Sequence, residues 1–263
     1  MDFELKDKVA LVTGGSRGIG RATALMLASS GTHVAICGRT VESLEETAAD
    51  IRKHRVQCWI YQTDVSKPKE IEALFHRIGS DATQIDILVN NAVTSTSAPF
   101  DQLTDDQFQY HIDVKLMAYI RIARLVLPFM ESQGGGRIVN VGGMTARIVA
   151  PLRMTNGVVN AGVANFTKQF AGYAARANVT VNCVHPGYTA TERVRQIFER
   201  ESIETGDDLE TVIAKRTAGI PLGKLIQPED MAAAILFFCS PLAQMITGQC
   251  IAVDGGSGAA IAY

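Results

Sequence analysis

The sequence predicts an α/β protein with a doubly wound parallel sheet, and three observations support this fold class. Short β-rich runs alternate with helical patterns along most of the 263 residues, which is typical of βαβ units. A glycine-rich turn joins the first β-rich run to the first helical pattern. Hydrophobic residues make up 47% and charged residues 20% of the chain, as in ordinary folded domains. No repeat or composition break divides the sequence, so we expect a single domain over residues 1–263.

Each element follows from its local pattern. The β-rich runs are short and apolar, as expected for strands that are buried on both faces of a parallel sheet. The helical patterns repeat apolar residues at spacings of three and four. Right-handed crossovers between successive strands then produce a doubly wound sheet. In chain order, we expect strands at 9–13, 33–37, 56–62, 85–89, 137–141 and 179–184, and helices at 17–30, 41–54, 68–78, 104–130 and about 152–177.

One segment interrupts this alternation. Residues 191–222 are charged and helix-prone, and they follow the last predicted strand. Insertions at the carboxyl edge of such a sheet often cover the ligand crevice. We therefore expect residues 191–222 to form a substrate lid within the single domain.

Charge and hydropathy exclude several classes of function. The net charge is -2, so no basic excess is available for binding a nucleic-acid backbone. The longest strongly apolar stretch, residues 231–239, is too short to span a bilayer. The N-terminal residues lack the apolar core of a signal peptide. We expect a cytoplasmic protein that binds neither nucleic acid nor a membrane.

The cysteine pattern does not predict a metal site. The chain has five cysteines, which are dispersed, form no C-x-x-C pair and stand mostly in apolar segments. Zinc sites need clustered ligands, so we interpret these residues as buried free thiols. They are Cys37, Cys58, Cys183, Cys239 and Cys250.

The glycine-rich turn predicts a dinucleotide site. Gly14, Gly18 and Gly20 follow the first strand and open the first helix. Glycines at these positions allow a tight turn and let backbone N–H groups approach a pyrophosphate at a helix N-terminus. The same residues match the G-x-S-x-G pattern of a hydrolase nucleophile elbow. We disfavour that alternative because Ser16 would lie within twenty residues of the N-terminus, with no evident His and acid partners.

The end of the second strand indicates which dinucleotide is bound. A cofactor without a 2′-phosphate requires an acid there to accept from the ribose 2′-hydroxyl, and residues 37–40 contain none. The Arg39 guanidinium offers several coplanar N–H donors to a phosphate, and Arg17 lies in the glycine turn nearby. We therefore expect NADP, with NAD less favoured. The alternative is that both arginines are solvated surface residues.

These motifs resemble the short-chain dehydrogenase/reductase family over nearly the whole chain. The T-G-x-x-x-G-x-G turn, Asp64-Val65, Asn90-Asn91-Ala92, the R-I-V-N run at 137–140, and N-x-x-x-P-G-x-x-x-T at 182–191 all match, as do C-terminal segments at 220–223, 228–230 and 247–256. The resemblance implies a Rossmann-like, seven-stranded parallel sheet and a homotetramer or homodimer. The motifs and the resemblance together predict cofactor contacts from Gly14, Ser16, Arg17, Gly18, Ile19, Arg39, Asp64, Val65, Asn91, Ala92, Gly187 and Thr191.

The resemblance also implies a proton relay, and this chain departs from it. In the family, a Tyr protonates the carbonyl oxygen, a Ser stabilises it, a Lys lowers the pKa of the Tyr, and an Asn anchors a water. No Tyr here is followed by a Lys four residues later. The flanking residues place Asn156 at the Tyr position, Asn160 at the Lys position, Gly143 at the Ser position and Lys115 at the Asn position. Val93 also replaces the Gly of N-N-A-G.

These replacements change the chemistry that is available. An amide such as Asn156 has no ionisable proton, and Gly143 has no hydroxyl, so the usual relay cannot operate. Lys115 is a candidate proton donor if burial lowers its pKa. Alternatively, its side chain only fills space in the crevice or extends to solvent. Tyr188 is a second candidate donor, or a wall residue of the substrate pocket.

Two main functions follow from these residues. The first is an NADP-dependent oxidoreductase with an atypical active site, for which we expect slow carbonyl reduction. The second is a non-catalytic dinucleotide-binding relative, such as a sensor or an assembly subunit. A lyase or isomerase that uses the same crevice is a further alternative. We expect a homo-oligomer that assembles through the two long helices and the C-terminal strand, because small residues on the second helix permit close packing.

Overall fold

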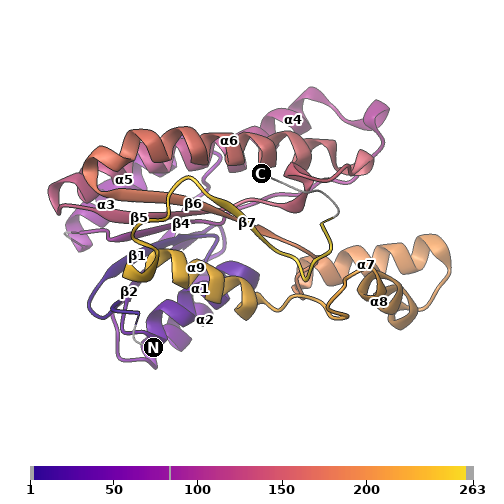
Figure 1. Cartoon of the computed structure of the whole chain (residues 1–263), viewed down its shortest axis with the longest axis horizontal. Coiled ribbons are helices and arrows are strands. Elements are labelled where there is room, and N and C mark those ends of the chain that lie inside the picture. The colour runs from indigo at the N-terminus through magenta and orange to yellow at the C-terminus, as the bar shows by residue number, and fades with distance from the viewer. Residues whose placement is uncertain (1–2, 83, 259–263) are drawn as a thin grey trace.

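The computed structural model describes residues 3–82 and 84–258 and contains a sheet of seven parallel strands (Figure 1). The strand order is β3-β2-β1-β4-β5-β6-β7, so the chain starts at the centre, runs to one edge and then crosses over to build the other half. This topology confirms the predicted doubly wound fold. The strands are β1 (Val9–Thr13), β2 (His33–Gly38), β3 (Cys58–Gln62), β4 (Ile87–Asn90), β5 (Gly136–Val141), β6 (Val179–Pro186) and β7 (Cys250–Val253).

Helices cover both faces of the sheet, as Figure 1 shows. The helices α1 (Gly18–Ser29), α2 (Val41–Arg52) and α9 (Pro228–Cys239) pack on one face. The helices α3 (Pro68–Asp81), α5 (Ala118–Ser132) and α6 (Met154–Ala174) pack on the other. Alternate residues of β1 contribute to the two separate cores, and all of them are buried. This double burial explains why the strands read as continuous apolar runs.

The long helix expected at 104–130 is interrupted. It consists of α4 (Asp105–His111), a π-helical turn labelled η2 (Ile112–Met117), and α5. Thr104 begins it with a capping box, in which its side chain accepts from the N–H of Gln107. Wide turns of this kind are found frequently at functional sites. The π-helical turn here contains Lys115.

The segment expected to form a lid is a pair of helices, α7 (Glu192–Thr205) and α8 (Leu209–Ala218). Figure 1 shows them beyond the end of the sheet at which β6 ends, outside the layers of helices that cover its faces. Thr191 and Asp208 cap their N-termini. Phe198 of α7 is buried and anchors the pair to the rest of the protein. Within the described residues, none of the helices combines the length and apolar character that crossing a membrane requires.

Candidate active site

The glycine turn after β1 has the geometry of an anion site. Gly14 and Gly18 have φ values of +63° and +53°, which L side chains rarely adopt. A Cβ at Gly20 would collide with the carbonyl oxygen of Gly14 and with the Asn91 amide. The helix that follows, α1, has no side-chain cap and no acid in its first turn. Its amino end is therefore available to a phosphate group.

Hydrogen bonds from the end of β4 hold this turn in place. The Asn91 amide donates to the carbonyl oxygens of Thr13 at 3.0 Å and Gly14 at 3.1 Å. In return, the Thr13 hydroxyl accepts from the N–H groups of Asn91 at 2.9 Å and Ala92 at 3.1 Å. The structure therefore brings Asn91 and Ala92 to the glycine turn, as the predicted cofactor site requires. The Asn91 side chain shapes the turn through these contacts.

Three further predicted cofactor residues, Asp64, Val65 and Thr191, lie in the segments that follow β3 and β6. Asp64 follows β3, and its carboxylate accepts from the N–H and the hydroxyl of Ser66. Val65 beside it is buried in the core. Thr191 lies against the glycine turn, since a Cβ at Gly18 would be 3.2 Å from its Cγ2 atom. The start of the lid therefore contacts the turn.

A cavity of about 260 Å³ lies between the glycine turn, the loop after β4 and the lid. Arg17 and Arg39, the pair predicted to hold a 2′-phosphate, both line it. The Arg39 guanidinium donates to the Tyr110 hydroxyl at 3.1 Å. The full lining is Arg17, Arg39, Val93, Thr94, Ser95, Ser97, Arg153, Arg193, Gln196, Ile197 and Arg200.

The positions of the proton relay meet at the turn that ends β5. Lys115 is only 3% exposed, and its Nζ donates to the carbonyl oxygen of Gly142 at 2.8 Å. Burial lowers the pKa of Lys115 to about 7; the Cys183 thiol opposes this shift, and the charge of Arg193 adds to it. Burial also lowers the pKa of His111, and the charge of Lys115 lowers it further. Lys115 can therefore carry or release a proton near neutral pH.

Two amides occupy the remaining relay positions. Asn160 lies directly against Gly143, where an added Cβ would collide with its amide nitrogen. That nitrogen donates to the Thr145 hydroxyl at 2.8 Å. Asn156 donates to the carbonyl oxygen of Thr94 at 3.4 Å. The amide oxygens of Asn156 and Asn160 are both buried and have no hydrogen-bond partner among the described residues. Both oxygens are acceptors, and neither amide can supply a proton as an acid.

Tyr188 lies farther out, between the sheet and the lid. Its ring packs at 5.8 Å from that of Phe198, and the Arg216 guanidinium lies 6.0 Å from the ring centre. Tyr188 does not line the arginine-lined cavity, so both roles considered for it stay predictions.

Several residues near the site belong to no sequence motif and were not predicted. Arg153 precedes α6, and Arg193 and Arg200 belong to α7. The Arg193 guanidinium donates to the carbonyl oxygen of Val93 at 3.1 Å and thereby ties the lid to the crevice. The spacing of seven between Arg193 and Arg200 places both on one face of a helix. This spacing is the one signal in the sequence that could have drawn attention to them.

Three dispersed residues form a cluster behind the turn at Gly142. The side-chain ligand atoms of Cys183, His185 and Cys250 lie within 4.8 Å of one another. Cys183 and Cys250 are register partners on β6 and β7, so the pairing of strands brings them together. The N–H of Gly143 donates to Nδ1 of His185 at 2.9 Å. This imidazole therefore supports the turn that carries the relay positions.

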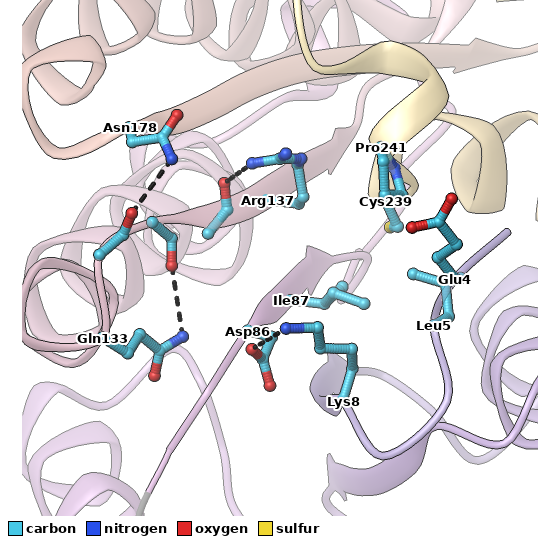
Figure 2. Close-up of a pocket in the computed structure, with 13 residues that line it drawn as sticks. Glu4, Leu5, Lys8, Asp86, Ile87, Gln133, Arg137, Asn178, Cys239 and Pro241 are labelled. Atoms are coloured by element: carbon cyan, nitrogen blue, oxygen red, sulfur yellow. Dashed lines mark hydrogen bonds and ion pairs between the residues drawn. The ribbon is translucent and has the colours of Figure 1, made fainter.

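A second cavity, of about 230 Å³, lies at the amino ends of β4 and β5. Figure 2 shows several of its polar groups engaged with one another: Lys8 pairs with Asp86, and the Gln133 amide donates to the carbonyl oxygen of Gly135. Ligands of doubly wound sheets bind beyond the carboxyl ends of the strands. We therefore place the candidate cofactor site in the arginine-lined cavity. None of the four relay positions lines this cavity; Lys115 contacts the turn at Gly142 instead.

Comparison with known proteins agrees with this geometry. A family model described as enoyl-(acyl carrier protein) reductase matches residues 14–258. The 3-oxoacyl-(acyl-carrier-protein) reductase FabG of Aquifex aeolicus is 34% identical over 257 residues, which cover 97% of this chain and 99% of the relative.

Two solved structures share the fold. The L-sorbose reductase of Gluconobacter frateurii, complexed with NADPH and L-sorbose, has a TM-score of 0.96 at 29% identity, covering 99% of this chain and 100% of that chain. An NAD+-bound xylitol dehydrogenase has a TM-score of 0.91 at 25% identity, covering 96% and 100%. Structures with this fold therefore include both an NADPH and an NAD+ complex.

Proposed function

Because the chain belongs to the short-chain dehydrogenase/reductase family, we propose that it is an NADP(H)-dependent oxidoreductase with a rebuilt proton relay. Its reaction interconverts a carbonyl and an alcohol. The observation that carries this proposal is Lys115, a buried amine with a pKa of about 7 that donates to the carbonyl oxygen of Gly142, next to the position of the family's Ser.

The residues present fit a dinucleotide. The positive φ values of Gly14 and Gly18 and the uncapped N-terminus of α1 suit a pyrophosphate. Arg17 and Arg39 line one cavity and suit a 2′-phosphate. The NADPH complex of the L-sorbose reductase supports this preference. When bound, NADPH supplies the hydride for the carbonyl carbon.

Lys115 provides the matching proton. One of its three ammonium hydrogens is used by the carbonyl oxygen of Gly142, which leaves two for a substrate oxygen or a bridging water. With a pKa of about 7, about half of the amines are protonated at neutral pH. General acids work best when their pKa lies near the working pH.

The replacements at Gly143 and Asn156 limit the rate. Neither position offers an acidic proton, and the Asn160 amide fills the space beside Gly143. General acid catalysis typically contributes about 10²–10⁴-fold, and a hydrogen bond to the developing oxyanion contributes about 10²–10³-fold. An enzyme that lacks the family's Tyr and Ser should therefore reduce simple carbonyls slowly.

A non-catalytic role is the second candidate, and one observation favours it. Lys115 is almost fully buried, and its amine already donates to the protein backbone. If no substrate reaches this buried amine, the chain binds the dinucleotide without reducing a carbonyl.

The test combines cofactor binding with turnover. NADPH binding is measured by fluorescence, and NADPH oxidation is then followed with a panel of aldehydes and ketones. We expect NADPH to bind and at least one carbonyl to be reduced. Lys115→Met should lower that rate about a hundredfold or more and leave NADPH affinity unchanged. Lys69→Met, at an exposed lysine of α3, is the matched control and should change neither.

The outcomes separate the two candidates. Tight NADPH binding without oxidation by any carbonyl supports the non-catalytic role. A rate that survives Lys115→Met rejects Lys115 as the donor while retaining the enzyme.

A further inference from the structure

The arginine-lined cavity holds more positive charge than the chain as a whole would suggest. The protein has a net charge of -2, yet five arginines line this one cavity, and no Asp or Glu of the described chain does. They come from separate parts of the fold: the glycine turn, the end of β2, the segment before α6, and the lid. They are Arg17, Arg39, Arg153, Arg193 and Arg200.

These charges are not neutralised within the protein. In the part of the chain that the structure describes, none of the five arginines forms an ion pair. Burial lowers the pKa of Arg193, and the charge of Arg17 lowers it further. Arg153 and Arg39 act on that pKa in the same direction. Like charges gathered in one cavity repel one another, so a bound anion would stabilise this arrangement.

The proposed 2′-phosphate accounts for two of these five arginines. Arg17 lies in the glycine turn and Arg39 follows β2, and both line the cavity where the proposed 2′-phosphate would bind. Arg153, Arg193 and Arg200 remain. Arg153 stands three residues before Asn156, so one of these cations adjoins the relay positions. Their placement therefore suits an anionic group on the substrate.

We propose that the substrate is an anionic carbonyl compound whose carboxylate or phosphate group is bound by Arg153, Arg193 and Arg200. This inference rests on the proposed function and names its substrate class. Guanidinium groups recognise both oxyanions through paired N–H donors. Because two of the three cations belong to α7, binding of the anion also holds the lid against the crevice. Thr94 and Ser95 offer neutral polar groups on the same cavity wall.

The same helix provides a matched control. Arg195 lies two residues from Arg193 but is exposed, and its Nε donates to Glu199 at 2.9 Å. It does not line the cavity. Its removal changes the charge of the lid as much as removal of Arg200 does, without changing the proposed site.

The test uses calorimetric titration of the full-length, NADPH-saturated protein. The probes are dihydroxyacetone phosphate, 2-oxoglutarate and neutral dihydroxyacetone, which compare phosphate, carboxylate and no charge. We expect at least one anionic probe to bind tenfold or more tightly than the neutral one. The double variant Arg153→Leu, Arg200→Leu should weaken that binding about tenfold to a hundredfold and change NADPH affinity by less than threefold. Arg195→Leu should have no effect on either.

Two results would overturn the inference. The first is equal binding of the neutral and anionic probes, or no binding of any probe. The second is a large loss of NADPH affinity in the double variant together with competition between the anions and NADPH, which would assign these arginines to the cofactor. The same titrations without NADPH separate this inference from the proposed function. If the cofactor fails to bind, anion binding that depends on Arg153 and Arg200 still supports the anion site.

Discussion

Replacing Lys115 with Met should stabilise the protein at neutral pH, even though it removes the proposed proton donor. The pKa of the amine falls from 10.5 in an exposed lysine to about 7 here, because burial penalises its charged form. At about 1.4 kcal/mol per pKa unit, this penalty is about 4 kcal/mol at pH 7. Loss of the hydrogen bond to Gly142 offsets about 1 kcal/mol. Met has a similar length and no charge, so we expect a net gain of about 3 kcal/mol.

The sign of the pH dependence follows from the same two pKa values. Between pH 7 and pH 10.5, the unfolded chain keeps its proton on Lys115 while the folded protein loses it. The unfolded state therefore binds more protons, and wild-type stability rises with pH through this range relative to the variant. The advantage of Lys115→Met should shrink by about 3 kcal/mol between pH 7 and pH 10. Below pH 7 it should stay constant.

Urea unfolding at pH 7, 8, 9 and 10, at one protein concentration, measures this difference directly. The contributions of all other titrating groups to the free energy of unfolding cancel when wild type and variant are compared at each pH. Lys69→Met serves as the control, and its stability difference should not vary with pH. A difference for Lys115→Met that is flat from pH 7 to pH 10 would show that the amine titrates as an exposed lysine does and that burial does not lower its pKa.

Three further predictions test the cofactor site and the assembly. Arg39→Ala should weaken NADPH binding about tenfold to a hundredfold and barely affect NADH in fluorescence titrations; equal wild-type affinities for the two cofactors would contradict this. Gly20→Ala should abolish binding of both cofactors in the same assay, because its Cβ collides with the glycine turn; retained affinity would count against the turn as the binding site. The chain should form a homodimer or homotetramer through its two long helices and its C-terminal strand; Val158 of α6 is 50% exposed, and Val149 in the loop before it is 91% exposed. A monomer in analytical sedimentation at micromolar concentration would reject that assembly.

Most of the fold could be predicted from the sequence because its strands and helices are locally encoded. Buried strands such as β1 and β4 are mainly apolar runs, and Gly14 and Gly18 stand where the chain requires a positive φ. The π-helical turn at 112–117 could not be predicted, since the apolar spacing continues through it. The packing of α4 and α5 around the site decides that local geometry.

The candidate site was predictable only where motifs mark it. The glycine turn, Arg17 and Arg39 could be placed because their positions along the first two strands fix their neighbours. Arg153 and Arg200 are far apart in the sequence and meet only when α7 folds over the crevice. Cys183 and Cys250 likewise become neighbours through the pairing of β6 with β7. Tertiary contacts of this kind leave no local pattern.

The most direct test of the account is the pH profile of carbonyl reduction in a single turnover with saturating NADPH. If Lys115 donates the proton, only its ammonium form is active, and its pKa of about 7 sets the midpoint. The wild-type rate should be constant below the midpoint and fall about tenfold per pH unit above it. The rate for Lys115→Met should be at least about a hundredfold lower and independent of pH. A wild-type rate that is constant from pH 6 to pH 9, or a variant that keeps the wild-type profile, would contradict the assignment of Lys115.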